Sequence, residues 1–482
     1  MKDQSSAANA TRLAPITVRE RIQALDVIRG FALIGIFLMN VEWFTRPITQ
    51  LGSGVDTSQA GFSFAASWFI YTFVQGKFWT MFSLLFGMGF AVMLTRAQSA
   101  EKPFVTPYVR RLVALFLFGS AHYLMIWTGD ILHNYAITAL ALLLIVSRGW
   151  KAWGAILLSV VAVALVLRSD EMVPTIAFVL LLGVLIFFLN RGSIDRFYKW
   201  GVTLYLLPFV LGLAYVGATQ VIPALDKPPT TQELQQRSER RAEREKDRIE
   251  EVRVHTHGSY ADTLAWRAKE YREEIPGMAG LSILALPMFM IGFWFVRSGV
   301  VVNLRQHLPL FRKLLHWTLP LGLLVTLASV GLHSNFPPGT GRLPSVAVAR
   351  VLFEIGALPL TIGYFSALVC LLATPWGARV LSPLRHAGRM ALTNYLGASL
   401  VSAWFFYGHG LGYYGLVSRG EQVLFVAVVF SLQLAFSALW LSRFRYGPME
   451  WLWRAATYWQ LPPMRRQPGE ALAAMPLGAA EA

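Results

Sequence analysis

Two histidines and an aspartate lie close together in the sequence, around a turn between two apolar segments. His122 lies near the end of the first segment, Asp130 follows the turn, and His133 lies in the first turn of the second segment. If the segments form an antiparallel helical hairpin, both histidines lie at similar depth on neighbouring helices. Imidazole and carboxylate groups placed in this way suit general acid–base catalysis. The sequence therefore predicts His122, Asp130 and His133 as catalytic residues.

Structural roles are alternatives for the same residues. Asp130 can cap the free N–H groups at the start of the second helix, and His122 can serve only as a hydrogen bond between helices. A zinc site is a third alternative, but two histidines and one aspartate lack a fourth ligand, so we predict no metal. The chain has a single cysteine, Cys370, which excludes an intramolecular disulfide.

A second group of polar residues lies at the starts of two other apolar segments and suits a phosphorylated cofactor. Asp26 and Arg29 are three residues apart, so they can pair on one helical face while Arg29 also reaches a phosphate. Arg389, Thr393 and Asn394 fall close to one face of a later helix, where they can hold a phosphate or an acyl carrier. An interfacial ion pair and contacts between helices are the structural alternatives.

Four further residues complete the predicted site. Lys77 is a cofactor-binding candidate, although a lysine at this point can instead extend to lipid headgroups at the interface. Asn40, at the outer end of the first apolar segment, and Trp127 and Tyr135, beside the histidines, are the predicted substrate-binding residues. The sequence contains no phosphate-binding glycine loop, nucleophile elbow or Walker motif.

The composition indicates that these residues belong to a membrane protein. Of the 482 residues, 55% are hydrophobic and only 15% are charged, whereas soluble proteins carry about 25% charged residues. The 32 Phe, 16 Trp and 16 Tyr exclude an intrinsically disordered chain. The composition therefore excludes an ordinary soluble enzyme.

Twelve apolar runs are long enough to cross a bilayer as helices. They lie at 28–44, 78–95, 111–127, 131–147, 152–167, 172–190, 200–222, 278–296, 314–332, 345–372, 389–407 and 421–441. A shorter stretch at 62–74 is predicted to be a partial helix that leads into the second span. We therefore predict an all-α, polytopic helical bundle with about twelve transmembrane helices.

The distribution of Lys and Arg predicts the orientation of the bundle. With both termini in the cytoplasm, the inner segments carry 26 basic residues and the short outer loops carry four. The net charge of +16 then lies mainly on the inner face, where anionic lipids attract it. The lipid bilayer, and no nucleic acid, is the predicted partner of this charge.

The same pattern divides the chain into five regions. We predict a cytoplasmic tail (1–24), an N-terminal transmembrane bundle (25–222), a charged periplasmic helical insert (223–275), a C-terminal transmembrane bundle (276–442) and a second cytoplasmic tail (443–482). The insert has acids and bases at helical spacings and a net charge of −1, which is typical of an exposed helix with many ion pairs. It is either a spacer or a cap over a substrate entrance.

Several motifs resemble those of the YeiB-like family, bacterial inner-membrane proteins with a domain of unknown function (418) in the C-terminal half. They are Leu25-Asp26-Val-Ile-Arg29-Gly30, Lys77-Phe78 with Leu84-Leu85-Phe86-Gly87, His122 with Trp127 and Gly129-Asp130-Ile131-Leu132, Gly388 to Leu396, and Gly447 to Arg454. The resemblance implies a multi-pass protein of the bacterial inner membrane.

The opening Leu-Asp-x-x-Arg-Gly motif is also similar to that of membrane acyltransferases, including the lysosomal heparan-glucosaminide acetyltransferase. This likeness implies transfer of an acetyl-like group from cytoplasmic acyl-CoA to a hydroxyl or amine of a membrane-embedded or periplasmic acceptor. Many of these enzymes carry a histidine near the end of the first span, where this chain has Asn40. His122 would therefore take the catalytic role. The alternatives are a transporter of a small or lipidic solute and a non-catalytic membrane partner or sensor. A homo-oligomer is compatible with each of these functions.

Overall fold

The described part of the chain is built from helices. The computed structural model describes residues 22–47, 54–167, 172–189, 192–222, 230–335 and 344–466. Among these residues, β-pairing is limited to two isolated bridges, Gly54 with Asn335 and Phe444 with Arg465. The predicted all-α class is confirmed.

Twelve helices coincide with the twelve predicted spans. They are α2 (Gln23–Asn40), α4 (Lys77–Ser99), α5 (Val105–Met125), α6 (Leu132–Ser147), α7 (Trp150–Leu167), α8 (Val173–Leu189), α9 (Asp195–Val221), α12 (Gly280–Arg297), α13 (Leu308–Leu332), α14 (Pro344–Leu372), α16 (Ala391–Phe406) and α17 (Arg419–Arg443). Seven helical segments of the described chain are long and apolar enough to cross a membrane, and α6, α7 and α8 are apolar but shorter. The chain is therefore a polytopic membrane protein.

The second span is broken near its middle. The helix α3 (Gly61–Phe69) continues as a π-helical turn, η3 (Ile70–Val74), which confirms the partial helix predicted at 62–74. Gly76 then takes a φ of +80°, a conformation that favours glycine, and α4 begins at the next residue, Lys77. The break places the start of α4 inside the bundle.

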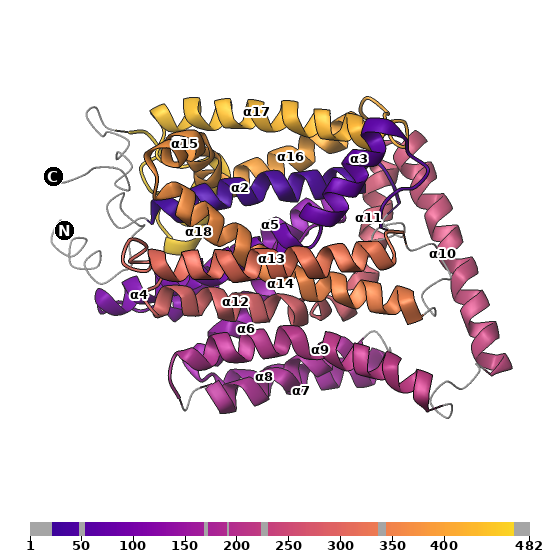
Figure 1. The fold of residues 1–482 in the computed structure, drawn as a ribbon, viewed down its shortest axis with the longest axis horizontal. Coiled ribbons are helices and arrows are strands. Elements are labelled where there is room, and N and C mark those ends of the chain that lie inside the picture. The colour runs from indigo at the N-terminus through magenta and orange to yellow at the C-terminus, as the bar shows by residue number, and fades with distance from the viewer. Residues whose placement is uncertain are drawn as a thin grey trace.

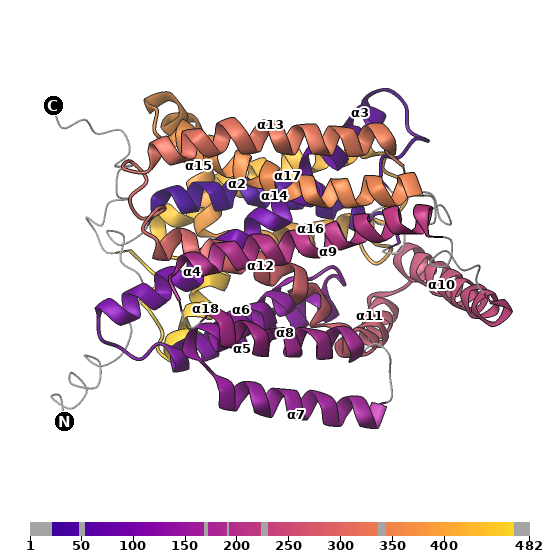
Figure 2. The ribbon, with the colours of Figure 1, turned by 60° about the horizontal axis from the view of Figure 1, so that its bottom comes forward.

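Most of the helices run along the long axis of the molecule (Figure 1). We name its two ends by what lies there: α2 begins at the terminal end, and the insert helices lie at the opposite insert end. The tightest packing joins α13 to α14, α4 to α12, and α2 to the short helix α15 (Pro375–Arg389). The helix α7 lies at the edge of the bundle (Figure 2) and packs mainly on α8.

Two helices form the insert. In α10 (Thr231–His257), Arg248 pairs with Glu245 and Arg253 with Glu250, which confirms the predicted exposed helix with ion pairs. The second helix, α11 (Tyr260–Glu274), lies against α5, because the Tyr260 hydroxyl donates to the Met125 carbonyl at 3.0 Å. The α11 helix therefore covers the insert end of the α5–α6 hairpin.

A short helix follows the last span within the region predicted as a tail. This helix, α18 (Pro448–Tyr458), packs against the first half of α5. The Trp453 indole donates to the Arg111 carbonyl at 2.9 Å, and the Arg111 guanidinium lies 3.5 Å from the centre of the Trp453 ring. The chain thus returns to the bundle after α17.

Candidate functional site

The α5–α6 hairpin brings the two predicted histidines onto one carboxylate. The Nδ1 atom of His122 lies 2.7 Å from Oδ2 of Asp130, and Nδ1 of His133 lies 3.0 Å from Oδ1 of the same residue. All three residues are buried in the bundle. The sequence-based expectation of two histidines and an aspartate in contact therefore matches the structure, while their catalytic role stays a prediction.

Asp130 also caps α6, so its structural and chemical interpretations are compatible. Its Oδ1 atom accepts hydrogen bonds from the backbone N–H groups of Leu132 at 2.8 Å and His133 at 3.2 Å. These two bonds hold the carboxylate in place for His122. A carboxylate accepts a hydrogen bond, so Nδ1 of His122 carries the proton that points to Asp130. In the neutral ring the other nitrogen, Nε2, then carries the lone pair.

Gly119 allows the hairpin to close this tightly. A Cβ atom at this position of α5 would overlap the His133 backbone nitrogen and lie 2.7 Å from Asp130 Oδ1. Real Cβ atoms do not make such contacts, so a larger residue would push α6 away from α5. The position of Asp130 between the histidines therefore depends on the absence of a side chain at Gly119.

The two histidines face different parts of the molecule. The Nε2 atom of His133 contacts the Asn134 amide at 3.0 Å and lies 3.9 Å from Glu274 of α11, toward the insert end. The His122 ring instead lies 5.2 Å from the ring of Tyr395, on α16. Within the described chain, His122 Nε2 is buried and has no hydrogen-bond partner. The buried Tyr395 hydroxyl interacts with the Asp130 carboxylate but forms no hydrogen bond of regular geometry there. His122 Nε2 is therefore an acceptor that a bound molecule can engage.

Tyr395, beside His122, also lies on the wall of a cavity of about 220 Å³. The cavity wall is formed by α2, α4, α5, α6, α15, α16 and α18, and includes Tyr395, Ile131 and Leu132 near the hairpin. Along α4 the wall runs from Phe82 to Arg96, a distance of about 21 Å at 1.5 Å per residue. The cavity is therefore an elongated space that joins the terminal end to the neighbourhood of His122.

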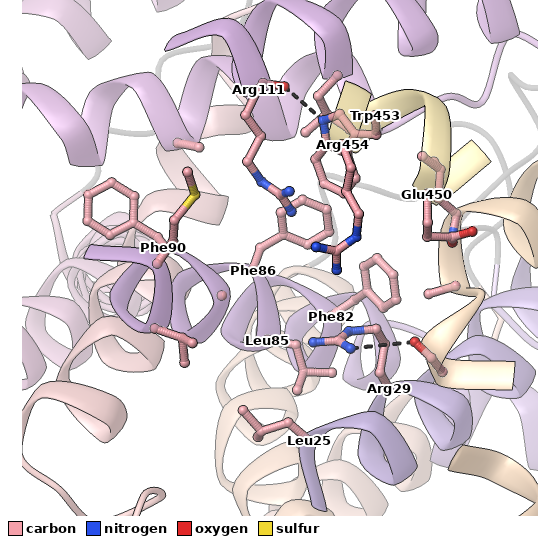
Figure 3. A pocket seen from close by; sticks show the side chains of 18 of the residues that line it. Leu25, Arg29, Phe82, Leu85, Phe86, Phe90, Arg111, Glu450, Trp453 and Arg454 are labelled. Atoms are coloured by element: carbon pink, nitrogen blue, oxygen red, sulfur yellow. Dashed lines mark hydrogen bonds between the residues drawn. The ribbon is translucent and has the colours of Figure 1, made fainter. Parts of the chain in front are cut away.

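The cavity combines cationic side chains with apolar walls. Five arginines and two acids line it: Arg29, Arg96, Arg111, Arg389 and Arg454, with Asp26 and Glu450. Figure 3 shows the guanidinium groups of Arg29, Arg111 and Arg454 directed into one space beside the rings of Phe82 and Phe86. This excess of arginine over acid suits a ligand with several anionic groups and an apolar or amide-containing arm.

Both acids on the cavity wall have structural partners. Asp26 pairs with Arg29 at 2.8 Å, as the sequence spacing predicted. Glu450 of α18 accepts hydrogen bonds at the start of α16, from the backbone N–H groups of Leu392 at 2.6 Å and Thr393 at 3.1 Å, and from the Thr393 hydroxyl at 2.6 Å. Thr393, predicted to bind a cofactor, therefore serves to attach α18 to α16.

The remaining predicted cofactor residues divide between two places. Arg29 and Arg389 lie on the wall of the same cavity, and Arg389 also donates to the Arg445 carbonyl at 3.2 Å. Lys77 lies elsewhere: its side chain is fully buried, with Nζ 3.6 Å above the centre of the Phe353 ring. The expectation that Lys77 extends to the headgroups is therefore wrong, because the break at Gly76 places the start of α4 inside the bundle.

The predicted substrate residues are not among those that line the arginine-lined cavity, and one of them, Trp127, lies beside His122. Trp127 stacks on Phe44, with its ring 6.1 Å from that of His122. Asn40 and Asn394 share the wall of a separate cavity of about 10 Å³, and the Asn394 amide donates to Ser437 Oγ at 2.9 Å. The Tyr135 hydroxyl and Ser83 Oγ share a hydrogen bond of 2.8 Å, and the Tyr135 ring packs on Phe82 and Phe86 of the cavity wall.

Sequence reasoning missed several residues of this site: Tyr395, Arg96, Arg111, Glu450 and Arg454. The arginines had been assigned to cytoplasmic segments, where they contributed to the prediction of orientation. Tyr395 and Glu450 occur inside motifs that carried the family resemblance, but nothing in their spacing indicated that they share a cavity. Among the residues that the structure describes, no cluster of three or more metal-binding side chains occurs.

Comparison with known proteins gives relatives of no assigned function. The family described as "Protein of unknown function (DUF418)" matches residues 295–460. The uncharacterized protein YxaH of Bacillus subtilis is 32% identical over 93% of this chain and 97% of its own length. The uncharacterized protein YeiB of Escherichia coli is 25% identical over 91% of this chain and 96% of its own length. No solved structure matches the chain.

Proposed function

We propose that this chain is an acyl-CoA-dependent membrane acyltransferase. The chain belongs to the YeiB-like family with the domain of unknown function 418. The observation that carries the proposal is the contact between the arginine-lined cavity and the histidine pair through Tyr395. Arginine side chains suit the phosphates of an acyl-CoA, and the elongated apolar part of the cavity suits its arm. The acyl group would then lie near His122.

The chemistry assigned to His122 is that of a general base. Its Nε2 atom accepts the proton of the acceptor hydroxyl or amine while that group attacks the thioester carbonyl carbon. The carbon–sulfur bond breaks, and the same Nε2 returns the proton to the departing thiolate. Asp130, 2.7 Å from Nδ1, stabilises the imidazolium formed between the two steps.

Tyr395 is the proposed donor to the reacting carbonyl. Its hydroxyl is buried close to the Asp130 carboxylate, forms no hydrogen bond of regular geometry within the described residues, and belongs to a ring 5.2 Å from that of His122. A donor held in a site without water stabilises the negative charge that develops on the carbonyl oxygen during acyl transfer. His122 and Tyr395 would thus act on opposite sides of the same carbonyl group.

The proposal includes a direction of transfer across the bacterial inner membrane. In this proposal the terminal end faces the cytoplasm, because the segments predicted to be cytoplasmic carry most of the basic residues. Acyl-CoA would enter the cavity at this end and bind the five arginines on its wall. The acceptor would approach from the insert end, beneath α11. Glu274 and Tyr271 of α11 lie beside His133 at this end, with Glu274 3.9 Å from His133.

Transport is a second candidate function, and the broken second span favours it. Discontinuous helices with a buried ionisable group mark substrate sites in many transporters. Here the break at Gly76 precedes Lys77, whose amine is fully buried and has no hydrogen-bond partner in the described chain. Lys77 does not line the arginine-lined cavity. The two functions therefore predict that different substitutions abolish activity.

Release of CoA from labelled acetyl-CoA by the purified protein tests the first function. We expect thiol release in detergent or liposomes, lost in His122→Gln and kept in Lys77→Gln. Solute flux without thiol release, lost in Lys77→Gln and kept in His122→Gln, would contradict the acyltransferase proposal and support transport.

A further inference from the structure

Arg267 on α11 is a buried cation that forms no ion pair with the residues that the structure describes. Its side chain is about 1% exposed. None of its three guanidinium nitrogens makes a hydrogen bond of regular geometry within the described residues, and its polar interaction there is with the Tyr407 hydroxyl. Burying an ion without a partner is strongly unfavourable, because the lost hydration is not replaced. Within the described part of the chain, the charge of Arg267 is therefore not balanced by an ion pair.

Arg419, at the same end of the molecule, is a second buried arginine, and its guanidinium has both an ion pair and hydrogen-bond acceptors. It is about 2% exposed, and its guanidinium contacts a Glu42 carboxylate oxygen at 3.1 Å and the Gln422 amide oxygen at 2.6 Å. It also donates to the Leu38 carbonyl at 3.3 Å. The two arginines have equal burial, but only Arg419 has an acid and acceptors beside it.

The described groups around Arg267 include tyrosines and histidines. Its guanidinium lies 5.4 Å from the ring of Tyr407, and the nearby Tyr414 hydroxyl is buried without a partner in the described chain. Burial, together with the charge of Arg267, lowers the pKa of His255 to about 3 and also lowers the pKa of His409. Both imidazoles are therefore neutral at pH 7, and Arg267 is the cation of this group.

One acid of the insert belongs to the same group of side chains. Glu251 of α10 interacts electrostatically with Tyr407 and Tyr414, and Tyr407 in turn lies beside Arg267. The surrounding backbone is a seam between the insert and the bundle, since the Gly408 N–H donates to the His255 carbonyl at 2.7 Å. An anion at Arg267 would therefore bind both sides of this seam.

We propose that Arg267 forms the centre of an anion site at the insert end, which takes a phosphate-type oxyanion. A guanidinium binds two oxygens of such a group at once, and tyrosine hydroxyls supply further donors. The oxyanion belongs either to free phosphate or to the headgroup of an anionic lipid. The site is separate from the arginine-lined cavity and does not depend on the acyltransferase proposal.

Thermal unfolding of the purified protein in chloride-free gluconate buffer, with inorganic phosphate added, tests the site. A ligand that binds only the folded protein raises the melting temperature, by about 5 °C at a hundredfold excess over its Kd. We expect phosphate to raise the melting temperature of the wild type and of Arg419→Gln in a saturable way, and to leave that of Arg267→Gln unchanged. Arg267→Lys, which keeps the charge, should retain a weaker rise if the glutamine variant does not fold.

Nanodiscs distinguish the two sources of the oxyanion. If the headgroup is the ligand, phosphatidylglycerol discs should stabilise the wild type more than phosphatidylcholine discs, and Arg267→Gln should abolish the difference. The proposal is overturned if phosphate and phosphatidylglycerol both leave the wild type unchanged. It is equally overturned if Arg267→Gln responds to them as the wild type does.

Discussion

Gly388 of α15 packs directly on the backbone of Asp26 in α2, so closely that a Cβ atom on Gly388 would overlap the Asp26 carbonyl oxygen. Gly30 makes the reciprocal contact with the Leu384 carbonyl. The crossing also brings the Arg29 guanidinium to 3.5 Å from the Gly388 carbonyl. Two glycines therefore determine where Arg29 and Arg389, distant in sequence, meet on one cavity wall.

Substitution of Gly388 by alanine should separate α2 from α15. Overpacking of this kind costs about 1–3 kcal/mol of folding free energy, measurable as a lower midpoint of thermal unfolding. Gly397→Ala is the matched control, because a Cβ atom there meets only Gln433 Nε2, at 3.9 Å. Equal stability of the two variants would show that the crossing tolerates a side chain.

His122→Gln should abolish CoA release while the protein stays folded. Glutamine retains a hydrogen-bonding group but takes up no proton at neutral pH, and loss of a general base typically lowers rates about 100- to 10,000-fold. A hydrogen bond between membrane helices is worth only about 0.6 kcal/mol, so the unfolding midpoint should change little. Full activity in His122→Gln would make this histidine purely structural.

Arg111→Gln should weaken binding of CoA, measured by titration calorimetry. A hydrogen bond to a charged group contributes about 1.5–3 kcal/mol, which corresponds to roughly a 10- to 100-fold loss of affinity. The neighbouring Arg110 is exposed and does not line the cavity, so Arg110→Gln is the control and should bind as the wild type. Binding that is equally weakened in both variants would indicate a general effect of surface charge.

The orientation can be tested with a single cysteine on the insert. In a Cys370→Ser background, Ser238→Cys lies on the exposed part of α10. We expect a membrane-impermeant maleimide to label it from outside intact cells whose outer membrane has been permeabilised. Labelling confined to inverted inner-membrane vesicles would reverse the predicted topology.

Acid should destabilise the packing of the insert through His255. Burial, with the charge of Arg267, holds the pKa of His255 at about 3, below its ordinary value of 6.5. Unfolding therefore takes up a proton as the pH falls below 6.5, and stability should drop by about 2 kcal/mol between pH 7 and pH 5. Thermal unfolding at both pH values should show a smaller drop for His255→Phe than for the exposed control His257→Phe.

Local sequence patterns were sufficient for the helices and for the histidine pair. Apolar runs predicted the positions of the twelve helices, seven segments of which are long and apolar enough to cross a membrane. The placement of His122 and His133 at similar depth on neighbouring helices, beside one carboxylate, followed from the symmetry of a tight hairpin, whose geometry depends on few residues. These features are local, so a single sequence contains the information for them.

The cavity could not be predicted in the same way. Its wall joins α2, α4, α5, α15 and α18, and the packing that brings them together depends on contacts such as that of Gly388 with Asp26. Lys77 illustrates the same limit. Its position near an apolar end suggested the interface, whereas the break at Gly76 turns the residue inward.

The return of α18 to the bundle has a consequence for how the protein is made. Glu450, Trp453 and Arg454 of α18 complete the cavity whose other side is formed by Asp26 and Arg29 of the first span. Synthesis proceeds from the N-terminus, so α2 is made long before α18. The first span therefore lies in the bilayer without its α18 contacts until nearly the whole chain has been synthesised. The site is thus the last part of the molecule to be assembled, and premature termination after α17 would leave an inserted bundle with an open, incomplete cavity.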